Sequence, residues 1–164
     1  QLEEGKHIIN RIDYDIIEQM ERIIFKFEPQ LEKKNLTVHF QPKYPSIYVH
    51  ADEERIEQVL INLLQNAIQF AYRDSKIDML IEKDEQHVKI HIRDYGEGIE
   101  KSEIHAIWKR FYKADEARTN KVGFGLGLAI VKSILDYHNS EVTVDSTVGE
   151  GTTFTFSLPL SKIS

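Results

Sequence analysis

Hydrophobic residues recur along this chain with two different periods. Steps of three and four residues predict amphipathic helices over about 15–31, 52–71 and 129–138. Alternation at every second position predicts strands at about 36–40, 47–49, 77–81, 88–92, 142–144 and 154–158. Helices interleaved with hairpin-like strand pairs predict the α/β (α+β) class, as a two-layer sandwich whose mixed sheet is covered on one face by helices.

Polar residues mark where the predicted helices begin. Asp15 and Asp52 each precede a helical pattern, and a carboxylate at that position can accept hydrogen bonds from free backbone N–H groups. A further short helix is expected over 103–111, with Ser102 as its cap, because apolar residues recur there at helical spacing.

The loop at 122–128 carries glycine at every second position and runs directly into an apolar helical pattern. Gly123, Gly125 and Gly127 let the backbone come within hydrogen-bond reach of a ligand, which a Cβ atom would prevent. A helix that starts on such a loop presents free N–H groups and its positive dipole end, which suit a phosphate. The alternative is a tight turn that packs the helix on the sheet. It stays open because the loop has neither the lysine of a P-loop nor the glycine pattern of a dinucleotide site.

Carboxamide side chains line one face of the predicted helix 52–71. Gln58, Asn62, Asn66 and Gln69 are spaced by four, four and three residues, so they form one row. Amides lower helix propensity without offering a charge pair. The row is either a solvated face or one polar wall of a site, and in a site its amide oxygens would suit Mg²⁺.

Asp94 ends a predicted strand and is followed by Gly96 and Gly98. Glycines at this spacing after a strand often form only a turn. A carboxylate at a strand end can also accept a hydrogen bond from the amino group of adenine, whereas guanine presents a carbonyl oxygen that a carboxylate would repel. The position is therefore a candidate for adenine recognition.

The segment 112–121 has an irregular pattern and carries several cations. Lys113, Arg118, Lys121 and the preceding Arg110 suit a polyphosphate bound beside a glycine-rich helix start. Two acidic residues in the same segment partly balance these charges, so a solvated charged loop is the alternative.

Length, composition and net charge limit the classes of protein to which this chain can belong. The 164 residues, 41% of them hydrophobic, indicate one domain with a sizeable core, and no apolar run approaches the roughly 18 residues that span a bilayer. The absence of cysteine excludes disulfides and thiol catalysis, and a formal net charge of −6 argues against a nucleic-acid surface. A start at Gln1 rather than methionine suggests a piece of a longer protein.

The motifs occur together in an order that resembles the catalytic and ATP-binding domain of bacterial sensor histidine kinases, in the GHKL superfamily. The matching boxes are LINLLQNA at 60–67 (N), DYGEGI at 94–99 (G1), WKRFYKAD at 108–115 (F), GFGLGL at 123–128 (G2) and GEGT at 149–152 (G3). The resemblance covers about 36–160 and implies the Bergerat ATP-binding sandwich, which type II topoisomerase, Hsp90 and MutL ATPases share.

The resemblance implies a role for each matching position. Asn66 would ligate Mg²⁺ between the ATP phosphates, with Asn62 beside it, and Asp94 would bind the adenine amine. Catalytic positioning would fall to Asn62, Arg110 and Lys113. The expected ATP-binding residues are Asn62, Asn66, Gln69, Phe70, Asp94, Gly96, Gly98, Ile99, Tyr112, Lys113, Gly123, Phe124, Gly125, Leu126, Gly127, Leu128 and Thr152.

The implied activity is transfer of the γ-phosphoryl group of Mg-ATP to a histidine on a separate helical domain, and from there to a response regulator. Related ATPases carry a glutamate four residues before the Mg²⁺ asparagine. Here that position is Asn62, which cannot accept a proton from water, so slow intrinsic hydrolysis is expected. None of the seven histidines has the family's following acidic residue and downstream proline, so the phosphoacceptor is expected outside this chain.

The resemblance also implies a domain organisation. Residues 1–33 would lead from a dimerisation and phosphotransfer domain, 34–160 would form the catalytic ATP-binding domain, and 161–164 would be a tail. The expected partners are ATP, the helical phosphoacceptor domain and the receiver domain of a response regulator, without nucleic acid. The domain is expected in the cytoplasm, as part of a parent protein attached to the membrane.

The resemblance leaves some departures and alternatives. Gln69 and Phe70 stand where the family usually has a basic residue and tyrosine, Val122 stands where a glycine is common, and Asn139-Ser140 replaces a usual glycine pair. Asparagine tolerates the left-handed backbone region better than serine does. An anti-sigma-factor-type serine kinase and a non-catalytic ATP-sensing module share the expected ATP site and remain alternatives.

Overall fold

The computed structural model describes residues 8–109 and 127–163. The helices are α1 (Ile16–Lys26), α2 (Glu28–Lys33), α3 (Glu53–Phe70) and α4 (Gly127–Tyr137), with a short 3-10 helix at Lys101–Glu103. The strands are β1 (Ile12–Asp15), β2 (Thr37–Phe40), β3 (Tyr48–Ala51), β4 (Lys76–Lys83), β5 (His87–Asp94), β6 (Val142–Thr147) and β7 (Gly151–Pro159).

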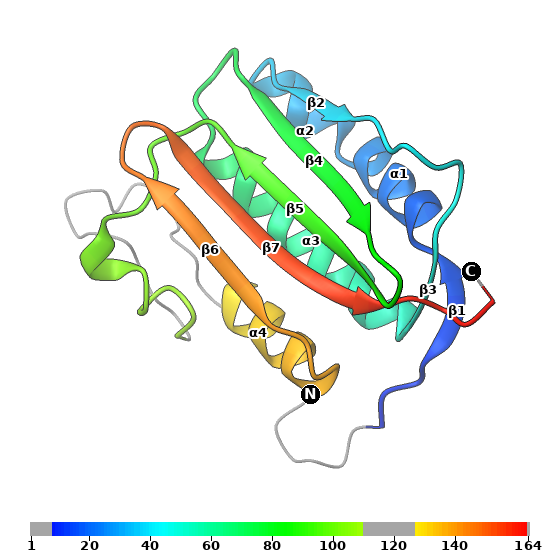
Figure 1. Ribbon diagram of the computed structural model, residues 1–164. Coiled ribbons are helices and arrows are strands. Elements are labelled where there is room, and N and C mark those ends of the chain that lie inside the picture. The colour runs from blue at the N-terminus through cyan, green and yellow to red at the C-terminus, as the bar shows by residue number, and fades with distance from the viewer. Residues whose placement is uncertain (1–7, 110–126, 164) are drawn as a thin grey trace.

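A five-stranded sheet forms one layer of the molecule, and helices form the other. Its strand order is β2-β4-β5-β7-β6, with β2 and β4 parallel and the other neighbouring pairs antiparallel. The helices lie behind one face of this sheet in Figure 1, with α3 running across its centre. The predicted two-layer sandwich with a mixed sheet is confirmed.

The core lies between the sheet and the helices. On β5, Val88, Ile90 and Ile92 are buried, while the side chains between them belong to the other face of the sheet. Leu60 and Leu63 of α3 are fully buried against this layer. Among the helices that the structure describes, none is both long and apolar enough to cross a membrane.

The segment expected as one helix over 15–31 is divided into two, and that expectation is wrong in this respect. Phe27 ends α1 and begins α2, and Pro29 lies in the first turn of α2. Proline has no N–H group to continue the hydrogen bonding of α1, but it fits the first turn of a new helix. Asp15 caps α1 as predicted, by accepting a hydrogen bond from the N–H of Ile17 at 3.0 Å.

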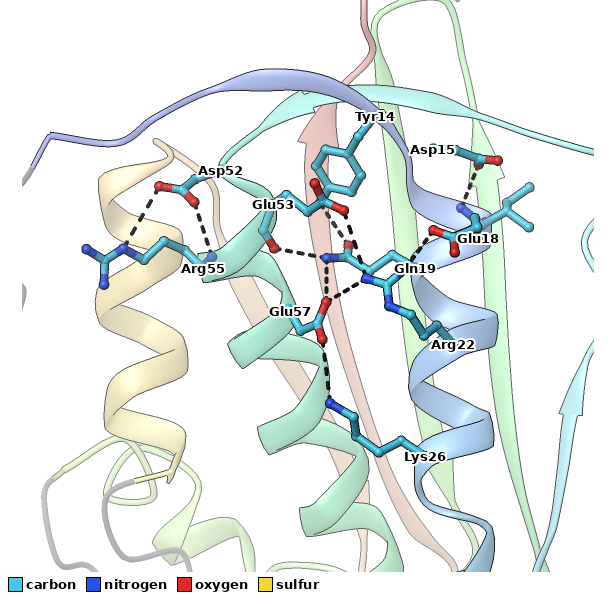
Figure 2. A network of polar contacts seen from close by, with 11 residues as sticks. Tyr14, Asp15, Glu18, Gln19, Arg22, Lys26, Asp52, Glu53, Arg55 and Glu57 are labelled. Atoms are coloured by element: carbon cyan, nitrogen blue, oxygen red, sulfur yellow. Dashed lines mark hydrogen bonds and ion pairs between the residues drawn. The ribbon is translucent and has the colours of Figure 1, made fainter.

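The four-residue strand β1, which precedes α1, was not expected from the sequence. It pairs antiparallel with β3, whose presence near 47–49 was predicted, and the two form a separate two-stranded sheet. A buried polar network then holds α1 on the beginning of α3 (Figure 2). Gln19 is its centre, because its amide accepts from the hydroxyl of Tyr14 at 2.8 Å and donates to the carbonyl of Glu53 at 2.9 Å.

The helix predicted over 103–111 is not formed in the part of that segment that the structure describes. A single 3-10 turn at Lys101–Glu103 is followed by turns up to residue 109, so Ser102 lies inside the short helix and does not cap one. The N–H of Ala106 donates to the carbonyl of Glu103, three residues earlier. Ile107 is still fully buried, because a turn that repeats every three residues satisfies the same apolar spacing as an α-helix.

The end of α4 has the backbone geometry that its asparagine allows. Asn139 has φ 56°, and the N–H of Ser140 donates to the carbonyl of Leu135 at 2.8 Å. This six-residue hydrogen bond around a left-handed residue closes a helix C-terminus. His138, which is buried just before Asn139, accepts a hydrogen bond from the N–H of Asp52 and so joins the end of α4 to the start of α3.

Candidate functional site

Asp94 continues the buried face of β5 with a charged side chain. It follows Val88, Ile90 and Ile92 at the two-residue period of the strand, and only 2% of its surface is exposed. Its Oδ1 atom is buried and has no hydrogen-bond partner, the only such side-chain atom found in residues 8–109 and 127–163. Burial raises the pKa of Asp94 to about 7, although a backbone hydrogen bond from Thr152 opposes the shift.

The loop after Asp94 lies directly against the end of α3. Ala71 and Gly96 form an antiparallel bridge, and the N–H of Tyr72 donates to the carbonyl of Tyr95 at 3.1 Å. A Cβ atom on Gly96 would lie 1.9 Å from the carbonyl oxygen of Phe70. Only glycine permits this approach, so Gly96 brings the loop onto the last turn of α3.

The other side of the loop is bound to the turn between β6 and β7. The N–H of Gly149 donates to the carbonyl of Glu97 at 2.8 Å, and the N–H of Ile99 donates to the Oγ of Ser146 at 2.8 Å. The same Ser146 hydroxyl lies 2.7 Å from the Oγ1 of Thr152. The segment 95–99 is therefore held on both sides, by α3 and by the β6–β7 turn.

The carboxamide row of α3 faces the beginning of α4. Gln58 donates to the Oδ1 of Asn62 at 2.8 Å, and the Nδ2 of Asn62 donates to the carbonyl oxygen of Gly127 at 3.1 Å. Gly127 is the first residue of α4, and a Cβ added to it would meet nothing closer than the Asn62 amide at 4.0 Å. Asn66, one turn further along α3, is 9% exposed.

These contacts make α3 the element that joins the separate parts of the site. Its middle turns carry the carboxamides that meet the start of α4, and its last turn meets the loop after Asp94. Both contacts lie toward the same end of the sandwich in Figure 1, where β5 ends and α4 begins. The loop that follows the Asp94 carboxylate, the carboxamides and the first residue of α4 are thus connected through one helix, and carboxylates, carboxamides and helix N-termini are groups that can bind a nucleotide.

Comparison with known proteins assigns the fold to a family. Residues 51–162 match the family described as "Histidine kinase-, DNA gyrase B-, and HSP90-like ATPase", which is more than half of the chain. The chain belongs to this ATPase family. The structure of the catalytic domain of the histidine kinase ThkA is similar to this chain, with a TM-score of 0.79 and 28% sequence identity. The match covers 92% of this chain and 95% of the ThkA chain.

Two bacterial sensor proteins are similar in sequence to this chain. The sensor histidine kinase WalK of Bacillus subtilis is 37% identical over 158 residues, which are 93% of this chain and 25% of WalK. The sensor protein SrrB of Staphylococcus aureus is 32% identical over 152 residues, which are 92% of this chain and 26% of SrrB. The chain therefore spans about a quarter of the length of these curated relatives.

A further similar structure is that of the histidine kinase ThkA in complex with the response regulator protein TrrA. It covers 98% of this chain and 45% of its own chain, with a TM-score of 0.78 and 25% identity. The sheet order and the helix layer described above are thus those of a kinase catalytic domain.

The structure brings together many of the residues expected at the ATP site of this ATPase family. It links Phe70 with Gly96, Ile99 with Thr152 through Ser146, and Asn62 with Gly127, as described above. Gly98 has φ +76° and its position would place a Cβ atom 2.3 Å from the carbonyl oxygen of Thr147.

Two of the expected residues make other contacts in the structure. Leu128 is 1% exposed and belongs to the hydrophobic core, so only its backbone is left to contact a ligand. Gln69 is half-buried, and only its backbone is engaged by Lys34, because its main-chain carbonyl oxygen accepts a hydrogen bond from that ammonium group at 3.0 Å, so the expected role of its side chain stays a prediction.

Part of the expected site falls outside the described residues. These positions are Arg110, Tyr112, Lys113, Gly123, Phe124, Gly125 and Leu126.

Ser146 and Lys34 are residues of the site that the sequence did not reveal. Ser146 lies on β6 among alternating polar and apolar residues, where a serine is unremarkable. Its position opposite Thr152 follows from the β6–β7 register, which becomes visible only when the strands are paired.

Proposed function

We propose that this chain is the catalytic ATP-binding domain of a two-component sensor histidine kinase. In this role it binds Mg-ATP and holds the γ-phosphoryl group in line with an incoming histidine imidazole from a separate helical domain. The imidazole nitrogen bonds to the γ-phosphorus, and ADP leaves. Because the nucleophile comes from the other domain, the work of this chain is to position ATP and to stabilise charge.

The buried carboxylate of Asp94 is the observation that carries this proposal. An acceptor without a partner inside a protein costs free energy, so its persistence calls for a ligand. The exocyclic amine of adenine supplies a donor for it, whereas the O6 carbonyl of guanine would be repelled. The missing Cβ atoms of Gly96 and Gly98 let the loop that follows this carboxylate pack directly on the backbone of Phe70 and Thr147.

The carboxamides of α3 fit a Mg²⁺ ion bound with a nucleotide. Asn66 would be its protein ligand, because Mg²⁺ takes few protein oxygens and fills its remaining positions with phosphate and water. When bound, the ion neutralises phosphate charge. Asn62, held between Gln58 and the carbonyl oxygen of Gly127, would orient the phosphates as a donor.

The longer relatives support an organisation around this domain. Residues 1–33 would connect a dimerisation and phosphoacceptor domain to the catalytic domain at 34–160. Arg110 and Lys113 would neutralise phosphate charge, and 123–128 would close over the triphosphate. A response regulator would receive the phosphoryl group on an aspartate of its receiver domain.

The test is a transfer assay with separated domains. The chain is mixed with γ-labelled ATP, Mg²⁺ and a separately produced helical domain that carries the phosphoacceptor histidine. We expect label on the helical domain that is lost in acid and kept in base, because a phosphoramidate bond hydrolyses in acid. The matched control is Asp94→Asn, which keeps the size of the side chain and removes its charge, and which should label far less.

The other outcomes of the assay separate the alternatives. Acid-stable label on a protein serine would indicate a serine kinase of the anti-sigma-factor type. Binding of Mg-ATP without any transfer to a supplied acceptor would indicate a sensing module. Wild-type protein that binds neither ATP nor ADP would contradict the proposal altogether.

A further inference from the structure

We propose that Lys34 is a positioning residue for the adenine pocket, because its ammonium group holds the end of α3 and, through it, the loop that follows Asp94. This inference rests on the proposed function, since it assigns the pocket to adenine. Lys34 lies in the connection between α2 and β2, outside the range 51–162 that matches the ATPase family.

The ammonium group of Lys34 makes three hydrogen bonds to one short stretch of backbone. It donates to the carbonyl oxygens of Ile68 at 2.8 Å, Gln69 at 3.0 Å and Ala71 at 2.7 Å. An ammonium group has three N–H donors, so these carbonyls use its full capacity. The partners are 34 to 37 residues away in sequence, and the contact is therefore tertiary.

A cation stabilises the C-terminal end of a helix, and the last turn of α3 carries no basic residue of its own. The last carbonyl groups of a helix have no intrahelical partner and carry the negative end of its dipole. No basic residue occurs in the last turn of α3, and the chain leaves the helix at Ala71 with extended backbone. Lys34 gives this turn both the hydrogen bonds and the positive charge.

The same short stretch of backbone contacts the adenine loop on its other side. Phe70 accepts a hydrogen bond from the N–H of Glu97, and Ala71 is bridged to Gly96. Lys34 and the loop therefore both bind the backbone of residues 68–72. A shift of this turn would move Gly96, because the two backbones are packed so closely that a Cβ atom added to Gly96 would lie 1.9 Å from the Phe70 carbonyl oxygen.

A second contact fixes the backbone from which Lys34 extends. The N–H of Asp74 donates to the carbonyl of Lys34 at 2.9 Å, and the side chain of Asn35 donates to the carboxylate of Asp74 at 2.9 Å. Both Asn35 and Asp74 have left-handed backbone, with φ 53° and 64°. The connection before β2 and the connection between α3 and β4 are thus joined by these hydrogen bonds, independently of the lysine side chain.

Lys34 also acts on Asp94 through its charge. Among the charged side chains that influence this carboxyl group, Lys34 has the largest effect and lowers its pKa, Glu97 raises it, and Arg93 lowers it. Burial acts against all of the lowering influences, and the pKa lies at about 7 as a result. Lys34 therefore favours the charged form, which is the form that accepts a hydrogen bond from an adenine amine.

The test compares Lys34→Met and Lys34→Arg with the wild-type chain. Two quantities are measured: the pKa of the Asp94 carboxyl group in the nucleotide-free protein, by carbon NMR, and the affinity for Mg-ATP by calorimetry from pH 6 to 8.5. In Lys34→Met we expect the pKa to rise by about half a unit or more, and the affinity at pH 7.5 to fall about three- to tenfold. Lys34→Arg should restore most of both values.

Two control variants separate an effect of Lys34 on the adenine pocket from a general loss of charge or of stability. Lys33→Met removes the same charge from an exposed neighbour and should change neither quantity. Asn35→Gly keeps the left-handed backbone and removes the side-chain hydrogen bond to Asp74, so it should lower stability without moving the pKa of Asp94.

The outcomes distinguish this inference from the proposed function. If Lys34→Met lowers the unfolding temperature but leaves the Asp94 pKa and the ATP affinity at their wild-type values, Lys34 is only structural and the inference is wrong. If the wild-type chain binds no ATP, the proposed function fails. The carboxyl titration still decides whether Lys34 positions Asp94, because it needs no nucleotide.

Discussion

Asp94 is the residue on which nucleotide recognition depends most directly. We expect Asp94→Ala to weaken ATP binding by roughly 1–3 kcal/mol, the cost of leaving a polar group of the ligand without a partner. The preference for ATP over GTP should shrink as well, because the repulsion of the guanine carbonyl disappears with the carboxylate. Calorimetry with both nucleotides measures this, and an unchanged ATP affinity would count against the assignment.

Asn66 is the second residue with a separable role. Asn66→Ala should remove the increase in nucleotide affinity that Mg²⁺ produces, since the carboxamide oxygen would be the ligand that the helix supplies. The fold should persist, because Asn66 keeps 9% of its surface exposed at the edge of the core. Titration of ATP with and without Mg²⁺ is the measurement. Asn66→Asp, which keeps an oxygen at the same place, is the control, and a response to Mg²⁺ equal to that of the wild type would remove the assignment.

Single residues differed in how far the sequence alone could reveal them. Asp94 was predicted because a carboxylate at the end of a strand can accept a hydrogen bond from a ligand amine, and its place on the buried face of β5 became clear from the structure. Lys34 was not found, because its partners are carbonyl groups of the backbone. Every residue has a backbone carbonyl group, so the sequence does not indicate which of them accept a hydrogen bond from a lysine, and only the structure shows such a contact.

At the scale of elements, periodicity located the helices and strands but not their interruptions. The long helix expected at the N-terminus was divided at Phe27, where Pro29 outweighs a continuous apolar pattern. Strand β1 was missed although it is as long as the predicted β2 and β3, and its existence depends on pairing with β3. Elements that rest on long-range partners are therefore the ones that local patterns do not determine.

His138 joins two elements and gives a pH prediction. Its Nε2 accepts from the N–H of Asp52 and its Nδ1 contacts the carbonyl of Ile134, an arrangement that requires a neutral ring with its proton on Nδ1. Burial lowers the pKa of His138 below its ordinary value, and the neighbouring charges are Arg11, Asp52 and Arg55.

The sign of the effect follows from proton binding. Below pH 6.5 or so the unfolded chain takes up a proton on this histidine that the folded chain resists, so the contribution of His138 to stability is present above that pH and lost as the pH falls. We expect the wild-type chain to lose more unfolding free energy than His138→Gln between pH 7.5 and pH 5, in urea titrations. Equal losses in the two proteins would contradict the buried neutral ring.

Asp94 also changes stability with pH in this range, so the effect of His138 has to be measured as a difference between the wild-type chain and His138→Gln. Its raised pKa means that the folded chain keeps a proton that the unfolded chain has released, so its contribution to stability falls as the pH rises from about 4 to 7. His138 and Asp94 therefore act in opposite directions over overlapping pH ranges. A wild-type profile alone would show their partial cancellation, and His138→Gln isolates one of them.

At the scale of the whole molecule, α3 connects the parts of the candidate site that lie in the described residues. Its first turn holds α1 and the end of α4, its middle carries the carboxamides, and its last turn holds the adenine loop. The two-layer sandwich and this central helix were predictable, because an 18-residue amphipathic segment must bury its apolar side on the sheet. The polar contacts at its ends were not predictable, because each joins residues more than 20 positions apart.

The contact between α1 and α3 provides a test of how the first helix is held. Gln19 is fully buried and joins the Tyr14 hydroxyl to the carbonyl of Glu53 (Figure 2). Burial raises the pKa of Tyr14 above its ordinary value, so the hydroxyl stays protonated and donates. Gln19→Leu keeps most of the volume but leaves that hydroxyl without its acceptor, and we expect about 1–3 kcal/mol less unfolding free energy in urea titrations.

Glu18→Gln is the matched control on the same helix. It weakens the 2.7 Å contact with Arg22, which lies at the surface, where an ion pair contributes about 1 kcal/mol or less. If both substitutions cost the same, the buried network would not be what holds α1 on α3. If only Gln19→Leu is costly, the buried network of Gln19 holds α1 on α3, the helix that carries the carboxamides.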